Sequence, residues 1–169
     1  MPTLHVCSLS RLPETVAATG AGHVVTLINA ATLVERPAAI PAEQHLFIGI
    51  NDIVDPIEGQ ILPATEHVER LIAFVEAWPR EKPLIFHCWA GVSRSTAAAF
   101  IAACVLNPDR DEATIGLALR QASPIATPNR RLIAIADELL GRSGRMIAAV
   151  EAIGRGVEAS EGEPFMLEL

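Results

Sequence analysis

The sequence contains no tyrosine, and only 4% of its 169 residues are aromatic. Its core must therefore be built mainly from leucine, isoleucine, valine and alanine. Apolar residues make up 50% of the chain, which is enough for one domain with a full hydrophobic core. We expect a single domain over residues 1–155, followed by an acidic and flexible tail over residues 156–169.

Cysteine is scarce as well. The three cysteines are Cys7, Cys88 and Cys104, and an odd number at such spacing does not indicate a disulfide framework. A reducing compartment suits them better. The N-terminus lacks a basic segment followed by an apolar run, so no signal peptide is expected. These features predict a cytoplasmic protein.

Long apolar runs and basic clusters are also missing. Residues Ala97–Leu106 form an uncharged apolar run of about half the length that a membrane span needs, so no membrane partner is expected. A net charge of −7 without a basic stripe argues against nucleic-acid binding. The histidines outside position 87 are dispersed and show no metal-ligand spacing. We therefore expect neither a metal nor another cofactor.

Short β-branched runs alternate with helical stretches, which is typical of an α/β domain with a mostly parallel central sheet. Four strands are expected, over Leu4–Cys7, His23–Ile28, His45–Ile50 and Leu84–His87. Helices are expected after Pro13 and over Ala64–Trp78, Ser93–Leu106, Asp111–Ala122, Pro128–Leu140 and Arg145–Ile153. The fold class is thus α/β, with a sheet of about four to five strands flanked by helices.

The segment from residue 83 to residue 106 has the pattern strand, loop and buried helix, and it carries the chemistry. Cys88 opens the loop and Arg94 lies in the first helical turn. Such a loop aims backbone N–H groups and the positive end of the helix at one point in space. Gly91 allows a tight turn, and the planar guanidinium of Arg94 can bind two oxygens of an oxyanion. The same donors stabilise a thiolate, so one loop both ionises a nucleophile and binds an anion.

The stretch His87-Cys88-Trp89-Ala90-Gly91-Val92-Ser93-Arg94-Ser95 resembles the signature of the cysteine-based protein tyrosine phosphatases. It is most similar to the small dual-specificity-like and bacterial tyrosine-phosphatase-like members, and the resemblance extends to about Leu140. It implies that Cys88 forms a phosphocysteine, that Arg94 binds the phosphate, and that Ser95 helps the thiolate leave. It also implies that His87 orders the loop. The phosphate-binding residues would be Trp89, Ala90, Gly91, Val92, Ser93 and Arg94.

The resemblance also implies a general acid on a loop before the cysteine. Two candidates follow the third expected strand, Asp52 and Asp55. We favour Asp52 because it directly follows the strand, whereas Asp55 precedes Pro56, where the chain is held extended. Asn129 matches the asparagine that braces the phosphate loop in these small phosphatases, and it is expected to be a supporting residue.

Two other functions remain open beside a metal-independent phosphatase. A sulfurtransferase of the rhodanese type also places a cysteine at the head of an anion-binding loop. A binding module could hold a phosphorylated partner without hydrolysing it. Among phosphatase substrates, a phosphotyrosine or dual-specificity phosphoprotein, or a small phosphate ester, is favoured because the loop contains no lysine.

Overall fold

The structure is a computed structural model that describes residues 3–168. Its centre is one five-stranded sheet with the strand order β3-β2-β4-β1-β5. The strands are β1 (Leu4–Ser8), β2 (His23–Ile28), β3 (His45–Gly49), β4 (Leu84–Cys88) and β5 (Phe165–Leu167). The first four strands are parallel, and β5 runs antiparallel to β1 at the edge.

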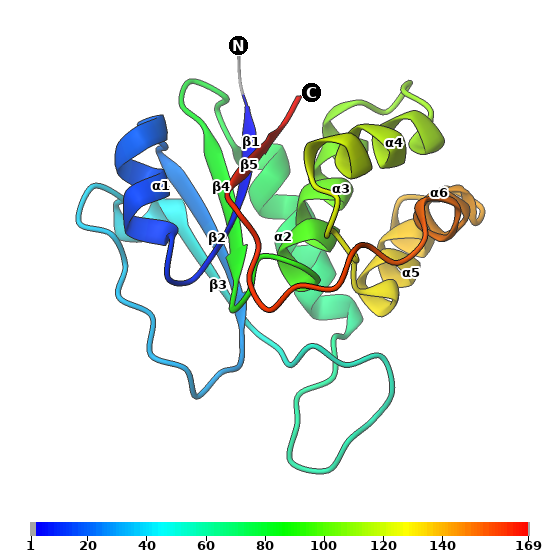
Figure 1. Ribbon diagram of the computed structural model, residues 1–169, viewed down its shortest axis with the longest axis horizontal. Coiled ribbons are helices and arrows are strands. Elements are labelled where there is room, and N and C mark those ends of the chain that lie inside the picture. Colours follow the sequence, from blue (N-terminus) through cyan, green and yellow to red (C-terminus); the bar gives the residue numbers. More distant parts are fainter. Residues whose placement is uncertain (1–2, 169) are drawn as a thin grey trace.

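Helices cover both faces of this sheet (Figure 1). Helix α1 (Leu12–Thr19) lies on one face together with the short 3₁₀ helix η1 (Ala42–Gln44) and its neighbouring loops. The other face carries α2 (Thr65–Ala77), α3 (Arg94–Leu106), α4 (Glu112–Ala122), α5 (Arg130–Leu139) and α6 (Arg145–Ile153). The predicted fold class, an α/β domain with a mostly parallel sheet flanked by helices, is confirmed.

Helix α3 is the centre of the larger core. Every residue of α3 except Val105 is buried, because β4, β1, α2, α4 and α5 all pack around it. This explains why its sequence is apolar on nearly all sides. A helix packed on all sides in this way is a firm support for the loop that precedes it.

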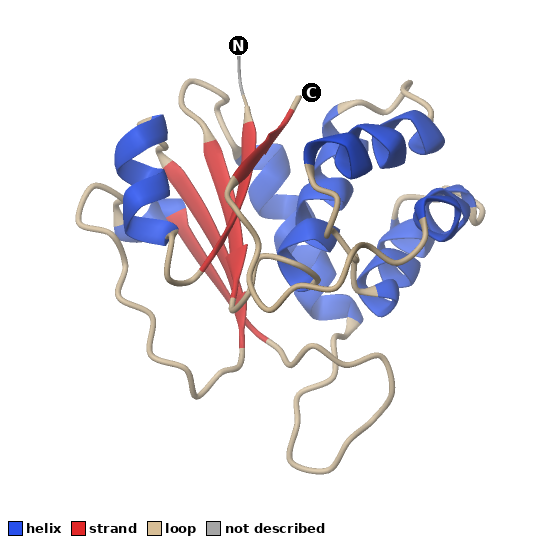
Figure 2. Cartoon of the chain, in the orientation of Figure 1, coloured by secondary structure: helices blue, strands red, loops and turns tan. Residues whose placement is uncertain are grey.

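The C-terminal residues, expected to form a flexible tail, lie against the fold in this structure. After α6 the chain crosses in front of the loop that follows β4 and then adds β5 beside β1 (Figures 1 and 2). Leu167 is buried in the main core, and Phe165 packs against that core. A strand of three residues has too short a pattern to be predicted from sequence, because its pairing depends on the partner strand.

Among the described residues, no helix has the length and hydropathy that crossing a membrane requires.

Candidate active site

The site lies where the parallel strands end. Strand β4 ends at Cys88 and α3 begins at Arg94, so residues 88–94 form the connecting loop, here called the phosphate loop. Strands β2 and β3 lie on one side of β4 and end close to this loop, at Ile28 and Gly49. In parallel α/β sheets, ligands bind at this carboxyl edge.

The carbonyl groups of the phosphate loop are held outwards by donors from other segments. Four backbone N–H groups make these bonds: Leu9 to Trp89 (3.1 Å), Gly162 to Ala90 (2.8 Å), Thr127 to Val92 (2.9 Å) and Asn129 to Ser93 (3.2 Å). In a trans peptide the N–H points away from the C=O, so loop N–H groups are left to face inwards. This arrangement makes a concave anion site of backbone donors.

Gly91 has a backbone φ of +73°, in the left-handed region. A Cβ atom at this position would lie 2.8 Å from the carbonyl carbon of Cys7 and 2.9 Å from the nitrogen of Ser8. Both atoms belong to the backbone of β1 and cannot give way. Glycine is therefore required here for conformation and for space.

The Cys88 side chain is buried, with only 2% of its surface exposed. Its Sγ lies 3.1 Å from the Ser95 hydroxyl and accepts a hydrogen bond from the Gly91 N–H at 3.3 Å. Ser95 occupies the first turn of α3, so its hydroxyl approaches the sulfur from the helix side. Two donors therefore converge on the sulfur, an arrangement that suits a thiolate.

Arg94 is nearly buried but keeps part of its guanidinium free. Its Nη1 donates to Asn29 Oδ1 at 2.9 Å and to the Ile50 carbonyl at 2.8 Å, which joins the ends of β2 and β3. Its Nε is buried and has no hydrogen-bond partner among residues 3–168. A buried N–H without a partner is costly, and an oxyanion in the loop would supply the missing acceptor.

His87 is completely buried beside Cys88. Its Nε2 lies 2.6 Å from the hydroxyl of Thr26, and its Nδ1 lies 3.4 Å from the Cys88 carbonyl oxygen. Burial lowers the pKa of His87 to about 4, although the hydrogen bond to the Cys88 backbone acts in the opposite direction. The ring is therefore neutral at neutral pH.

Of the two candidate acids, the structure brings Asp52 to the phosphate loop. Its Oδ1 accepts hydrogen bonds from the Ser93 hydroxyl at 2.8 Å and from Asn129 Nδ2 at 2.9 Å. Asp55 is exposed and has no hydrogen-bond or ion-pair partner within the described part of the chain. Of the two, Asp52 is thus the one that is hydrogen-bonded to the phosphate loop.

Asn129 joins three parts of the site. Its Oδ1 accepts from the N–H groups of Arg131 and Leu132, which caps α5. Its Nδ2 donates to Asp52 and to the Ile53 carbonyl, while its own N–H bonds to the phosphate loop at Ser93. The side chain thus braces the loop of Asp52, and the backbone braces the phosphate loop.

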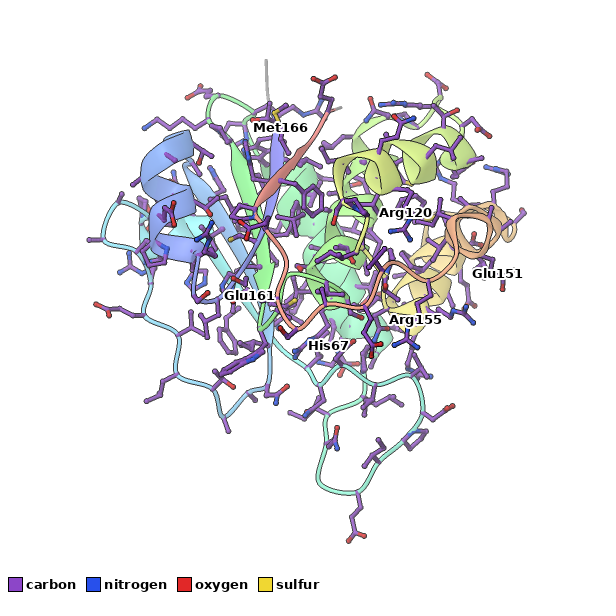
Figure 3. All side chains as sticks on the ribbon, viewed as in Figure 1. His67, Arg120, Glu151, Arg155, Glu161 and Met166 are labelled. Carbon is purple, nitrogen blue, oxygen red and sulfur yellow. The ribbon has the colours of Figure 1, made fainter. Side chains whose placement is uncertain are left out.

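Two cavities border the site. One, of about 500 Å³, is lined by Asp52, Ser93, Arg130 and Arg155, among others, and the second, of about 420 Å³, lies along residues 52–57 and 127–130. Arg155 belongs to the C-terminal segment, as does Glu161 (Figure 3). Trp89, in the phosphate loop, is 63% exposed. Open space is thus present beside Asp52.

Sequence reasoning missed several residues of the site, namely Asn29, Thr26, Ser8 and Glu161. Asn29 directly follows β2, so the rule that ligands gather at the carboxyl ends of parallel strands could have found it. Glu161 accepts hydrogen bonds from the hydroxyls of Ser8 and Ser10 across more than 150 residues of sequence. No local pattern could have indicated that pairing.

The other two cysteines belong to the core. Cys7 packs in the α1-side cluster and Cys104 in the α3-side core. Burial raises the pKa of each thiol to about 12. Among residues 3–168, no group of three or more histidine, cysteine, aspartate or glutamate side chains has an arrangement that could hold a metal ion.

Comparison with known proteins agrees with this geometry. A family model for phosphatase-like phytases, described as "Inositol hexakisphosphate", matches residues 55–106, which include the whole phosphate loop and α3. No curated protein matches the chain in sequence.

Solved phosphatase structures are similar over most of the chain. DUSP15 has a TM-score of 0.67 at 17% identity, covering 90% of this chain and 91% of its own. PTP-2 phosphatase of Cydia pomonella has a TM-score of 0.63 at 20% identity, covering 80% and 84%. Human DUSP28 has a TM-score of 0.61 at 22% identity, covering 83% and 89%. The chain thus has the dual-specificity-phosphatase-like fold of the cysteine-based tyrosine phosphatase superfamily.

Proposed function

We propose that this chain, which has a dual-specificity-phosphatase-like fold, is a metal-independent phosphatase that hydrolyses phosphate monoesters through a phosphocysteine on Cys88. The observation that carries the proposal is the combination of three groups. One loop carries the buried Cys88 sulfur, which accepts from the Gly91 N–H, backbone N–H groups turned inwards, and at its end Arg94, whose buried Nε has no partner among residues 3–168.

In the first step the Cys88 thiolate attacks phosphorus, and the bond to the leaving oxygen breaks. Asp52, beside the loop at Ser93, gives its proton to that oxygen, so the alcohol leaves neutral. Arg94 and the loop N–H groups bind the non-bridging oxygens, on which negative charge is spread in the transition state. The product of this step is a phosphocysteine and an ionised Asp52.

In the second step water attacks the phosphocysteine. Asp52 now accepts a proton from the water, and the phosphorus–sulfur bond breaks. The Ser95 hydroxyl, 3.1 Å from Sγ, donates a hydrogen bond to the departing thiolate. The cycle ends with inorganic phosphate, a thiolate and a protonated Asp52, so no cofactor is consumed.

For the substrate we favour a phosphotyrosine or dual-specificity phosphoprotein, or a small aryl phosphate. Two similar structures bear names of the dual-specificity type, and the phosphate loop contains no lysine. The exposed Trp89 at the loop would offer an apolar contact to an aryl group.

The decisive experiment is hydrolysis of p-nitrophenyl phosphate without added metal, in the presence of a chelator. We expect activity in the wild type, none in Cys88→Ser, and a loss of about a hundredfold in Arg94→Lys, because lysine cannot bind two oxygens in one plane. Mass spectrometry of acid-quenched enzyme should show a phosphate adduct on Cys88. Activity that survives in Cys88→Ser would refute the mechanism.

The two alternatives make different predictions for the same wild-type protein. A sulfurtransferase would form thiocyanate from thiosulfate and cyanide and would leave aryl phosphate intact. A binding module would bind a phosphopeptide and release no phosphate. Because the phosphate loop carries both Cys88 and Arg94, we expect neither result.

A second candidate substrate is an inositol polyphosphate. The family match to phosphatase-like phytases favours it, and so do Arg130 and Arg155, which line the cavity next to Asp52. Neither arginine forms an ion pair or a side-chain hydrogen bond within residues 3–168, so both guanidinium groups are available to further phosphates. Glu158 lines the same cavity and opposes this attraction.

The two substrate classes are separated by comparing kcat/KM for inositol hexakisphosphate and for a phosphotyrosine peptide. If the inositol ester is the substrate, Arg130→Ala and Arg155→Ala should lower kcat/KM for it several-fold more than for the peptide. Arg110→Ala, in the turn after α3, is the matched control, because it removes an equal charge away from the cavity. An equal effect of all three variants would exclude specific recognition by this arginine pair.

A further inference from the structure

A line of three polar side chains crosses the α1 side of the sheet. His45, at the start of β3, has its Nε2 at 2.7 Å from the hydroxyl of Thr26 on β2. The same hydroxyl lies 2.6 Å from Nε2 of His87 on β4. Nδ1 of His87 is then 3.4 Å from the carbonyl oxygen of Cys88. Hydrogen bonds thus connect half-buried His45, on the edge strand β3, to the backbone of Cys88.

The donors in this line can be assigned by counting protons. The Cys88 carbonyl can only accept, so Nδ1 of His87 must carry the proton. His87 is neutral because burial lowers its pKa to about 4, so its Nε2 is bare and accepts from the Thr26 hydroxyl. That hydroxyl has one proton and gives it to His87, so it must accept from Nε2–H of His45. Every donor in the line points toward Cys88.

We propose that Thr26 and His45 are positioning residues of the active site, because together they set the tautomer of His87 and through it the orientation of the Cys88 carbonyl. This inference rests on the proposed function, in which Cys88 is the nucleophile. Neither residue touches the substrate. They act through His87, which lies on the opposite face of β4 from the Cys88 side chain.

The alternative tautomer of His87 would disturb the start of the phosphate loop. With its proton on Nε2, His87 would turn a nitrogen lone pair toward the Cys88 carbonyl oxygen at 3.4 Å, and both groups are acceptors. The carbonyl would rotate away, and the peptide at the start of the phosphate loop would rotate with it. Since Sγ receives its hydrogen bond from the Gly91 N–H of that same loop, the thiolate would lose support.

His45 donates a hydrogen bond to the Thr26 hydroxyl in both of its protonation states. Burial and, to a smaller extent, the charge of Arg36 lower its pKa, so the ring is neutral at neutral pH and needs the Nε2–H tautomer. A protonated His45 would also donate from Nε2. The charged or titratable groups that act on the line are Arg36 on the loop after β2, His45 itself, and His87. These hydrogen bonds therefore keep the same donors whatever the protonation state of His45. They orient the Cys88 carbonyl and do not act as a pH switch.

The test compares pairs of variants at each position. Thr26→Val keeps the shape and removes the hydroxyl, while Thr26→Ser restores it. His45→Leu removes the donor, while His45→Gln keeps an N–H donor near the position of Nε2. The first readout is kcat/KM for p-nitrophenyl phosphate. The second is the pH at which alkylation of Cys88 by iodoacetamide reaches half its maximal rate, with the melting temperature recorded for each variant.

We expect Thr26→Val and His45→Leu to lower kcat/KM about tenfold, as for the loss of one hydrogen bond that acts on the thiolate. Both should also move the alkylation midpoint to higher pH. Thr26→Ser and His45→Gln should stay near the wild type in both readouts. A purely structural role would lower the melting temperature without moving the alkylation midpoint.

The alkylation assay does not depend on phosphatase activity, so it separates the failure of this inference from the failure of the proposed function. If the wild type hydrolyses aryl phosphate and Thr26→Val and His45→Leu leave the midpoint unchanged, the inference is wrong and the proposed function stands. If Thr26→Val does not fold, the His45→Leu and His45→Gln pair decides alone, because His45 is only half-buried at the edge of the sheet.

Discussion

Asp52 and Asp55 are three residues apart on one loop, but the structure gives them different surroundings. Asp52 accepts hydrogen bonds from Ser93 of the phosphate loop and from Asn129 at the start of α5. Both carboxylates are exposed, but Asp55 has no hydrogen-bond partner in the described part of the chain and lines only the cavity of about 420 Å³. A general acid must lie within hydrogen-bond reach of the leaving oxygen, so the contact of Asp52 with Ser93 supports our proposal that Asp52 is the acid.

We predict that Asp52→Asn lowers kcat about a hundredfold for phenyl phosphate, because the alcohol must then leave as an anion. The loss should be smaller for p-nitrophenyl phosphate, whose phenolate is a better leaving group. Asp55→Asn is the matched control and should keep kcat within about twofold of the wild type, as is usual for a surface change away from the chemistry. If Asp55→Asn had a strongly lowered kcat while Asp52→Asn had a nearly normal one, Asp55 rather than Asp52 would be the general acid.

At the scale of elements, the C-terminal segment acts as a strap across the phosphate loop. We use the word strap for residues 156–168. Gly162 donates its N–H to the Ala90 carbonyl, Glu161 accepts from Ser8 at 2.6 Å, and β5 pairs with β1 beyond them. The loop residues Ala90 and Gly91 are therefore held between the end of β1 and the strap.

We predict that weakening the strap reduces activity without touching the catalytic groups. Glu161→Gln should lower kcat/KM for p-nitrophenyl phosphate several-fold, because a neutral amide is a weaker acceptor for two hydroxyl groups than a carboxylate. Glu168→Gln is the control, because Glu168 is an exposed carboxylate of the same strap with no hydrogen-bond or ion-pair partner in the described structure. Equal kinetics for the two variants would mean that the strap does not position the loop.

The wild-type strap should also respond to acid. The hydroxyls of Ser10 and Ser8 lower the pKa of Glu161, so the carboxylate form persists below the usual titration range of a glutamate. The contribution of Glu161 to stability is then present above the ordinary pKa of a glutamate. It is lost as the pH falls through the lowered pKa of Glu161.

For the whole molecule, the buried histidines contribute to the response of stability to pH. All five, His5, His23, His45, His67 and His87, have pKa values lowered by burial. In the unfolded chain they take up protons near pH 6.5, whereas the folded protein resists protonation. The unfolded state therefore binds more protons in this range, and stability falls as the pH falls.

We predict that the free energy of unfolding decreases as the pH is lowered from about 6.5 to 4. His87 alone should contribute about 3 kcal/mol, since burial lowers its pKa to about 4 from the ordinary value of 6.5. Urea unfolding at several pH values measures this dependence. His87→Asn should flatten the curve over the same range, and an unchanged slope would contradict the neutral, buried state of His87.

The sequence by itself determined the order of the elements and the loop from Cys88 to Arg94. The alternation of strands and helices follows from local apolar patterns, and each of the four predicted strands ends within one residue of its observed position. The spacing from Cys88 to Arg94 is local too, because one strand, one loop and one helix create the anion site. Such features need no knowledge of distant residues.

Only the tertiary structure decided which distant residues complete the site. Asn29 and Ile50 reach Arg94, Thr26 reaches His87, and Gly162 reaches Ala90, each across more than 40 residues of sequence. These contacts depend on the strand order β3-β2-β4-β1-β5, which brings the carboxyl ends of β2, β3 and β1 around the end of β4. Local patterns specify each strand, but strand order is settled by packing of the whole chain, and so are the partners of the phosphate loop.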